Sequence, residues 1–174
     1  EVLPHYFAMG VNNSKMCYEP IMEYGKEAMK SNRNNQLSKA YEQVVLAIIV
    51  STALASIYLT AEHTVHYNSG LAHAIFYSMT SYPHIEKKHL HGEVVSYGVL
   101  NLLLVDQNTE DFERVYNFNK SVGLPTCLED LEFEKSQIDD LAKGAVVMKD
   151  IEHNPYVITG EMLSEAMRKL EALK

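Results

Sequence analysis

The chain has 174 residues, of which 47% are hydrophobic and 22% charged, so it is long and apolar enough for a folded core, which excludes disorder and fibrous repeats. Its formal net charge of -8, with no strong basic patch, makes nucleic acid an unfavourable partner. The two cysteines, Cys17 and Cys127, have neither CxxC spacing nor the density of a disulfide scaffold. We therefore predict reduced thiols and a cytoplasmic location.

Two long helices are predicted in the first third of the chain. The chain begins "EVLPHYFAMG", without an initiator Met or a signal peptide, and we expect it to be cut from a longer protein. Apolar spacing predicts a helix over residues 14–31, bent at Pro20. Residues 37–63 read as one long helix that is apolar on most faces, which predicts the buried central helix of the domain.

The charge-free run over residues 44–61 touches the length of a membrane span. Its Ala, Ser and Thr content, and the absence of an aromatic belt and of basic flanks, favour a buried helix instead. We expect no membrane partner.

Five further helical segments follow in chain order. Asn68 and Ser69 are candidate caps of a short helix that ends before Pro83, and "HGEVVSYGVLNLLLVD" forms the next helix. A third has Thr109 as its predicted N-cap and stops at Gly123, and "EKSQIDDLAKGAVVM" and "TGEMLSEAMRKLEAL" complete the chain. Because no convincing alternating strand pattern occurs, we predict an all-α, multi-helix bundle forming one domain over residues 1–174.

Histidines cluster in the middle of the chain. Six of the eight fall within about thirty residues: His63, His66, His73, His84, His89 and His91. Neutral imidazole is a common metal ligand, and a catalytic zinc or iron(II) site needs about three protein ligands and one open position. Two histidines on adjacent antiparallel helices and one carboxylate would supply that set.

Two of these histidines have the most suggestive context. His73 lies near the start of a helix between two small alanines, and His91 begins the following helix, where the helix dipole disfavours imidazolium. Gly92 lets the backbone approach a neighbour or a ligand. Glu93 has two interpretations: an acid stabilised by the helix N-terminus, or a partner that orients a ligating histidine.

The other histidines are weaker candidates, since a single histidine is more often a surface or core residue than a ligand. We predict that His84 and His89, which flank Pro83 and two lysines, are loop residues. His63 and His66, spaced i and i+3, could share a helix face and bind a metal, as a less favoured alternative.

The segment "SGLAHAIFYSMTSYPHIEKKHLHGEVVSYGVL" resembles the metal-binding core of the glycerol dehydrogenase branch of the iron-containing (group III) alcohol dehydrogenases. The segments "KSVGLPTCLEDL" and "IEHNPYVITGEMLSEAM" extend the likeness. The resemblance implies a helical C-terminal domain like those of the dehydroquinate synthase-like enzymes.

The resemblance also implies a ligand set and a reaction. His73 and His91 match the family's two histidines, and Glu1 stands where the family has an Asp, although the related dehydroquinate synthases use Glu. These residues would hold zinc or iron(II), which would polarise a substrate hydroxyl while NAD accepts the hydride. Glycerol or another small polyol or alcohol is the implied substrate, and a homo-oligomer is expected.

Two departures from the family pattern leave alternatives open. The stretch "AEHTVHYNSG" replaces a Gly-rich family segment, and no βαβ unit with a Gly-rich turn is present. We therefore expect the chain to be a C-terminal half that is inactive alone, with any dinucleotide-binding domain upstream of Glu1. The alternatives are a dehydroquinate-synthase-like lyase, a non-catalytic helical metal-binding module, and a helical domain without metal.

Overall fold

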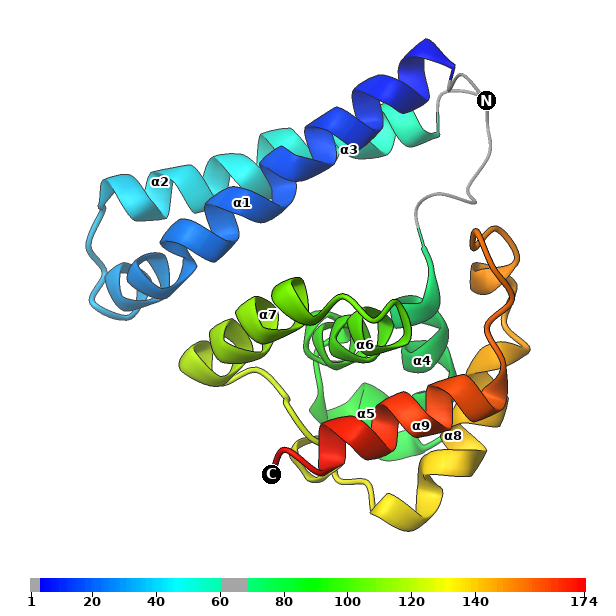
Figure 1. The fold of residues 1–174 in the computed structure, drawn as a ribbon. Helices are drawn as coiled ribbons and strands as arrows, with labels where there is room; N and C mark the ends of the chain where they lie inside the picture. Colours follow the sequence, from blue (N-terminus) through cyan, green and yellow to red (C-terminus); the bar gives the residue numbers. More distant parts are fainter. Residues whose placement is uncertain (1–3, 61–68) are drawn as a thin grey trace. The chain divides into compact units, whose positions relative to one another are not determined.

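The regular structure of the protein is helical throughout the described residues, which are 4–60 and 69–174 of the computed structural model (Figure 1). No strand occurs in these ranges, so the prediction of an all-α fold is confirmed. Contacts divide the chain into two compact units, residues 1–68 and 69–174. We call the described parts of these the hairpin unit and the bundle unit.

The hairpin unit is a pair of long helical segments. Helix α1 (His5–Arg33) packs against α2 (Lys39–Leu46) and α3 (Thr52–Leu59), as Figure 1 shows. The sequence placed the start of the first helix at residue 14, whereas α1 begins at His5, directly after Pro4. Proline has a φ suited to a helix start, and the carbonyl of Pro4 accepts the Ala8 N–H at 3.0 Å. The helix predicted over residues 14–31 is therefore present, but it begins earlier in the chain.

A π-helical turn, Ala47–Ser51, joins α2 to α3. The widened turn leaves backbone carbonyls that side chains can reach. The Oγ1 of Thr52 donates to the Ala47 carbonyl at 3.1 Å, and the Nδ2 of Asn13 on α1 donates to the Ser51 carbonyl at 2.6 Å. The second hydrogen bond links α1 to the π-helical turn.

The predicted burial of this second segment is wrong for the hairpin unit. Ile48, Ile49 and Ile57 are 55%, 64% and 61% exposed. The physical reason is that the unit supplies one partner helix, α1, which covers a single face of a segment that is apolar on most faces. By length and composition alone, Lys39–Leu59 would suffice to cross a membrane, with a mean hydropathy of 1.8.

The bundle unit is built around α4 (Leu71–Met79). This helix packs against α6 (His91–Val105) and α8 (Ile138–Val146), and α9 (Gly160–Glu171) packs against both of those helices. Helix α7 (Thr109–Val122) packs on α6, and α5 (Pro83–Lys88) connects α4 to α6. The core consists of fully buried apolar side chains from these helices and the turn after α7, among them Leu71, Ile75, Met79, Leu100, Leu128, Leu141, Leu163 and Met167.

Small residues let α4 approach both of its neighbours closely. A Cβ at Gly98 on α6 would lie 2.6 Å from the carbonyl oxygen of Ala72. A Cβ at Gly144 on α8 would collide with the Oγ of Ser78, and that hydroxyl donates to the Leu141 carbonyl at 2.8 Å. Helix α4 is thus fixed on two sides, which also fixes the position of His73 in its first turn.

Several helix ends differ by a residue or two from the prediction. Gly70, not Ser69, is the N-cap of α4, and Asn68 lies outside the described residues. The side chain of Asn108, one residue before Thr109, accepts the Asp111 N–H at 3.2 Å. Both pairs of neighbouring residues are good caps by type, so sequence alone does not separate them. The stop at Gly123 is confirmed by its left-handed φ of 81°.

Candidate metal centre

Two histidines of the bundle unit lie close together, one on α4 and one on α6. His73 lies in the first turn of α4, and His91 is the first residue of α6. Their ring centroids are 5.5 Å apart, with an angle of 42° between the ring planes. The two strongest candidates from the sequence are therefore brought together by the packing of α4 on α6.

The spacing of the two rings fits shared coordination of one ion. Two imidazoles bound to one tetrahedral zinc through bonds of about 2.0 Å hold their ring centroids roughly 5 Å apart. The observed separation of 5.5 Å is close to that value. The separation of the two rings is therefore compatible with binding to one shared ion.

Electrostatics keep the His73 ring neutral. Burial lowers the pKa of His73 below its usual value, and the nearby His91 lowers it further, while the charge of Asp150 acts in the opposite direction. His73 also lies in the first turn of α4, whose positive dipole end disfavours imidazolium. Neutral imidazole is the form that binds a metal.

Phe76 restrains the second ring. Its side chain projects from α4 one turn after His73, and its ring centroid lies 4.5 Å from that of His91 in an edge-to-face arrangement of 72°. Aromatic contacts of this kind favour one relative orientation of the rings. Phe76 was not among the residues predicted from the sequence, although its i+3 spacing from His73 is the signal that places it on the same helix face.

The structure resolves the two interpretations of Glu93 in favour of helix capping. The Oε2 of Glu93 accepts the Leu90 N–H at 2.9 Å, which satisfies a free donor at the start of α6. It also lies 3.7 Å from the Nδ1 of His89. No described protein atom lies within 4 Å of a Cβ built on Gly92, so no protein neighbour requires glycine there.

The remaining histidines have other surroundings. His84 lies within α5, not in a loop as predicted, because Pro83 begins that helix at its first position instead of only ending the previous one. Its Nε2 is 3.1 Å from the Leu131 carbonyl, and its ring packs beside Phe133. His89 follows the same helix as its C-cap.

The carboxylate that the sequence predicts as a third ligand is not among the described residues. Glu1, His63 and His66 fall outside the described residues. Within residues 4–60 and 69–174, no group of three His, Cys, Asp or Glu side chains is arranged to hold a metal ion. Among the described residues, His73 and His91 thus form an incomplete ligand set.

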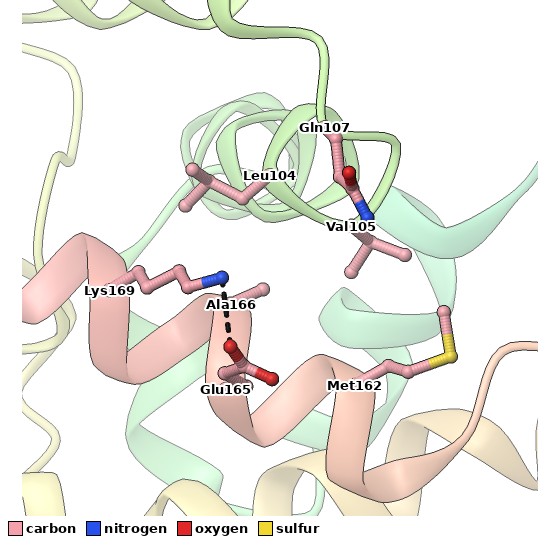
Figure 2. Close-up of a pocket in the computed structure, with 7 residues that line it drawn as sticks. All are labelled: Leu104, Val105, Gln107, Met162, Glu165, Ala166 and Lys169. Carbon is pink, nitrogen blue, oxygen red and sulfur yellow. Dashed lines mark ion pairs between the residues drawn. The ribbon is translucent and has the colours of Figure 1, made fainter.

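A separate pocket of about 120 Å³ lies between the end of α6 and α9 (Figure 2). The Glu165 carboxylate and the Lys169 ammonium pair within it at 2.9 Å, and Met162 closes one side. None of the residues that line it is a histidine. This pocket is therefore distinct from the candidate metal centre.

Comparisons with known proteins show what the chain is similar to. It is 31% identical to a glycerol dehydrogenase of Thermotoga maritima over 89% of this chain and 42% of that protein. It is 31% identical to a glycerol dehydrogenase of Citrobacter freundii over 92% of this chain and 43% of that protein. Hydroxycarboxylate dehydrogenase A of Escherichia coli is 27% identical over 100% of this chain and 48% of its own length. No protein-family profile matches.

Solved structures agree on the fold. A probable glycerol dehydrogenase from Sinorhizobium meliloti superposes with a TM-score of 0.80 at 24% identity, over 95% of this chain and 46% of that one. The glycerol dehydrogenase of Schizosaccharomyces pombe gives 0.77 at 22% identity, over 95% and 41%. The chain spans somewhat less than half the length of the curated relatives it matches. Its homologues are glycerol and hydroxycarboxylate dehydrogenases, which indicates an oxidoreductase family, and the chain fits the C-terminal half of such an enzyme.

Proposed function

We propose that this chain supplies His73 and His91 to one divalent metal site of an NAD-linked dehydrogenase that oxidises glycerol or a similar small polyol or alcohol. The observation that carries the proposal is the 5.5 Å separation of the two rings, in a chain whose relatives are named glycerol dehydrogenases. Glu1 is the proposed carboxylate ligand. We further propose a cytoplasmic homo-oligomer that binds neither nucleic acid nor membrane.

The ligand chemistry suits zinc or iron(II), since two imidazoles and one carboxylate bind both and leave a position open for substrate. When bound, such an ion would act as a Lewis acid on the substrate hydroxyl. The chain's own part is to keep the His73 ring neutral by burial and to restrain His91 against Phe76. We propose that NAD binds elsewhere in the full-length protein, because the curated relatives are more than twice as long as their match to this chain.

The experiment is elemental analysis by mass spectrometry of the full-length protein, purified without a metal-binding tag, together with an NAD reduction assay on glycerol. We expect about one zinc or iron per chain and turnover. The variants His73→Ala and His91→Ala should lose the metal and retain the helical circular dichroism signal. His5→Ala, an exposed histidine at the start of α1, is the matched control and should keep the metal.

The other readings predict different outcomes. A non-catalytic module would contain the metal but turn over no polyol or alcohol with NAD or NADP. A dehydroquinate-synthase-like lyase would instead release phosphate from a phosphorylated sugar acid. A protein without metal and without turnover would contradict the proposal.

A further inference from the structure

The ring of His91 is exposed and is held by side chains of another helix. Its neighbours along the chain give it no support, since Leu90 is 72% exposed and a Cβ built on Gly92 has no described atom within 4 Å. Within residues 4–60 and 69–174, the His91 imidazole makes no hydrogen bond and no ion pair. Its ring instead contacts those of His73 and Phe76, which lie one turn apart on α4. The orientation of the His91 ring therefore depends on α4.

Phe76 is a firmly placed partner for this ring. The preceding residue, Ile75, is fully buried, and the Ser78 hydroxyl two residues further on donates to the Leu141 carbonyl of α8 at 2.8 Å. These contacts fix the turn of α4 that carries Phe76. The Phe76 ring also has an edge-to-face contact with Tyr77, with a centroid separation of 5.2 Å and an angle of 62°. Both the backbone and the ring of Phe76 are thus restrained.

The contact between Phe76 and His91 is the better defined of the two contacts that His91 makes with α4. Its centroid separation of 4.5 Å and its angle of 72° match the edge-to-face arrangement that aromatic pairs prefer. The contact with His73 is longer, at 5.5 Å, and tilted at 42°. The ring of Phe76 is therefore the stronger restraint on the orientation of His91.

We propose that Phe76 is a positioning residue, which orders the His91 ring before a metal binds. This inference rests on the proposed function for its effect on metal binding. An unrestrained histidine populates three staggered χ1 wells, each with two broad χ2 orientations. A contact that selects the orientation facing His73 removes this choice in advance, and the apparent metal affinity rises with the fraction of molecules in that orientation. Phe76 thus favours assembly of the ligand pair without binding the ion itself.

The order of the His91 ring in metal-free protein tests the inference directly. Carbon-13 relaxation of full-length protein labelled at the histidine Cε1 atoms reports this order on the timescale of rotamer exchange, and His91→Ala assigns the signal. We expect a well-ordered His91 ring in the unmodified protein. Phe76→Leu keeps an apolar side chain but removes the ring, and it should make the His91 ring mobile. Phe76→Tyr keeps the ring and should restore the order.

A matched control separates this effect from a general loss of packing. Phe118→Leu makes the same change at a partly exposed phenylalanine on α7, and it should leave the order of the His91 ring unchanged. Thermal unfolding followed by circular dichroism establishes that each variant is folded. A His91 ring that stays equally ordered in folded Phe76→Leu overturns the inference.

Metal affinity gives a second, independent readout. Titration of the full-length protein with Co²⁺ should show roughly 3- to 6-fold weaker binding for Phe76→Leu, the factor that follows from the freed χ1 wells alone or together with the χ2 orientations. Phe76→Tyr and Phe118→Leu should bind like the unmodified protein. The cobalt absorption spectrum should keep its shape in every variant, because the ligands are the same. Unchanged affinity in Phe76→Leu, or a changed spectrum, would contradict the positioning role.

The two proposals fail in distinguishable ways. If the unmodified full-length protein binds no metal, the proposed function fails, and the order of the His91 ring still decides whether Phe76 positions it. If the unmodified protein binds metal and Phe76→Leu changes neither the ring order nor the affinity, only the role of Phe76 fails.

Discussion

The imidazole rings of His73 and His91 lie 5.5 Å apart although 17 residues separate them along the chain. This proximity depends on how closely α4 and α6 approach each other. The contact between the two helices is made at Gly98 and Ala72, where the absence of a side chain on Gly98 brings the backbones together. The candidate site is therefore a consequence of the packing of small residues in the bundle unit.

Gly98→Ala should destabilise the protein. The added Cβ would lie 2.6 Å from the Ala72 carbonyl oxygen and 2.8 Å from its Cα, and these backbone atoms cannot move without shifting α4. Overpacking of a tight core costs about 1–3 kcal/mol. Urea unfolding followed by circular dichroism measures this loss. Gly92→Ala, on the same helix with no neighbour within 4 Å, is the control and should be neutral or slightly stabilising. Equal stability of the two variants would contradict the packing argument.

Glu93→Ala should weaken the start of α6 without removing the metal. The carboxylate accepts the Leu90 N–H, and loss of such a cap costs about 1 kcal/mol. Unfolding in urea gives the loss of stability, and elemental analysis gives the metal content. Glu93→Gln retains an acceptor oxygen and should lose less stability. A metal content that falls to near zero in both variants would show that Glu93 belongs to the ligand sphere instead.

Asn13→Ala should destabilise the hairpin unit at its π-helical turn. The Nδ2 of Asn13 is the side-chain donor to the Ser51 carbonyl, and a hydrogen bond of this kind contributes about 1 kcal/mol. Hydrogen exchange of the backbone amides in α3 should become faster. Asn12→Ala removes only an exposed bond to the Ala8 carbonyl of its own helix, and it should leave this exchange unchanged.

The buried carboxyl group of Glu171 should make the stability of the folded protein depend on pH. This side chain is 4% exposed and accepts the Leu128 N–H at 2.7 Å, and burial raises the pKa of its carboxyl above the ordinary value of 4.5. Because the folded state then holds the proton more tightly than the unfolded state, stability falls as the pH rises from 4.5 through the raised pKa. Glu171→Gln should therefore increase the melting temperature at pH 7, and this gain should disappear near pH 4.

Glu165 on the same helix supplies the control for that experiment. It is exposed, and its hydrogen bond to Lys169 lowers the pKa of its carboxyl, so the sign of its effect is opposite. Glu165→Gln should give no increase at pH 7. If Glu171→Gln lowers the melting temperature at pH 7, the buried carboxylate is stabilising in its ionised form, and the prediction is wrong.

Sequence patterns predicted those features that depend on local chemistry. The all-α class, the start of α6 at His91 and the stop at Gly123 each follow from periodicity or from a residue type with one strong preference. Pro83 illustrates the limit, because proline ends one helix and is equally suited to begin the next. The π-helical turn has no comparable signal in the sequence.

The candidate site was predictable in part for the same reason. The motifs around His73 and His91 identified both histidines, whereas the contact between Phe76 and His91 joins two helices and has no motif of its own. That contact depends on how α4 packs against α6, which the sequence pattern of either helix alone does not determine. The apolar segment of the hairpin unit, Lys39–Leu59, was wrongly predicted to be buried. Its hydrophobicity alone did not indicate that α1 covers a single face and leaves other apolar side chains exposed.

Counting the imidazole ligands of the bound metal is the most direct test of the central claim. X-ray absorption spectroscopy at the metal edge of the full-length protein reports the number of histidine rings in the coordination sphere. We predict two rings in the unmodified protein and one or none, with weaker binding, in His73→Ala and in His91→Ala. Two rings that persist in either variant, or a metal-free unmodified protein, would contradict the claim that His73 and His91 share one metal ion.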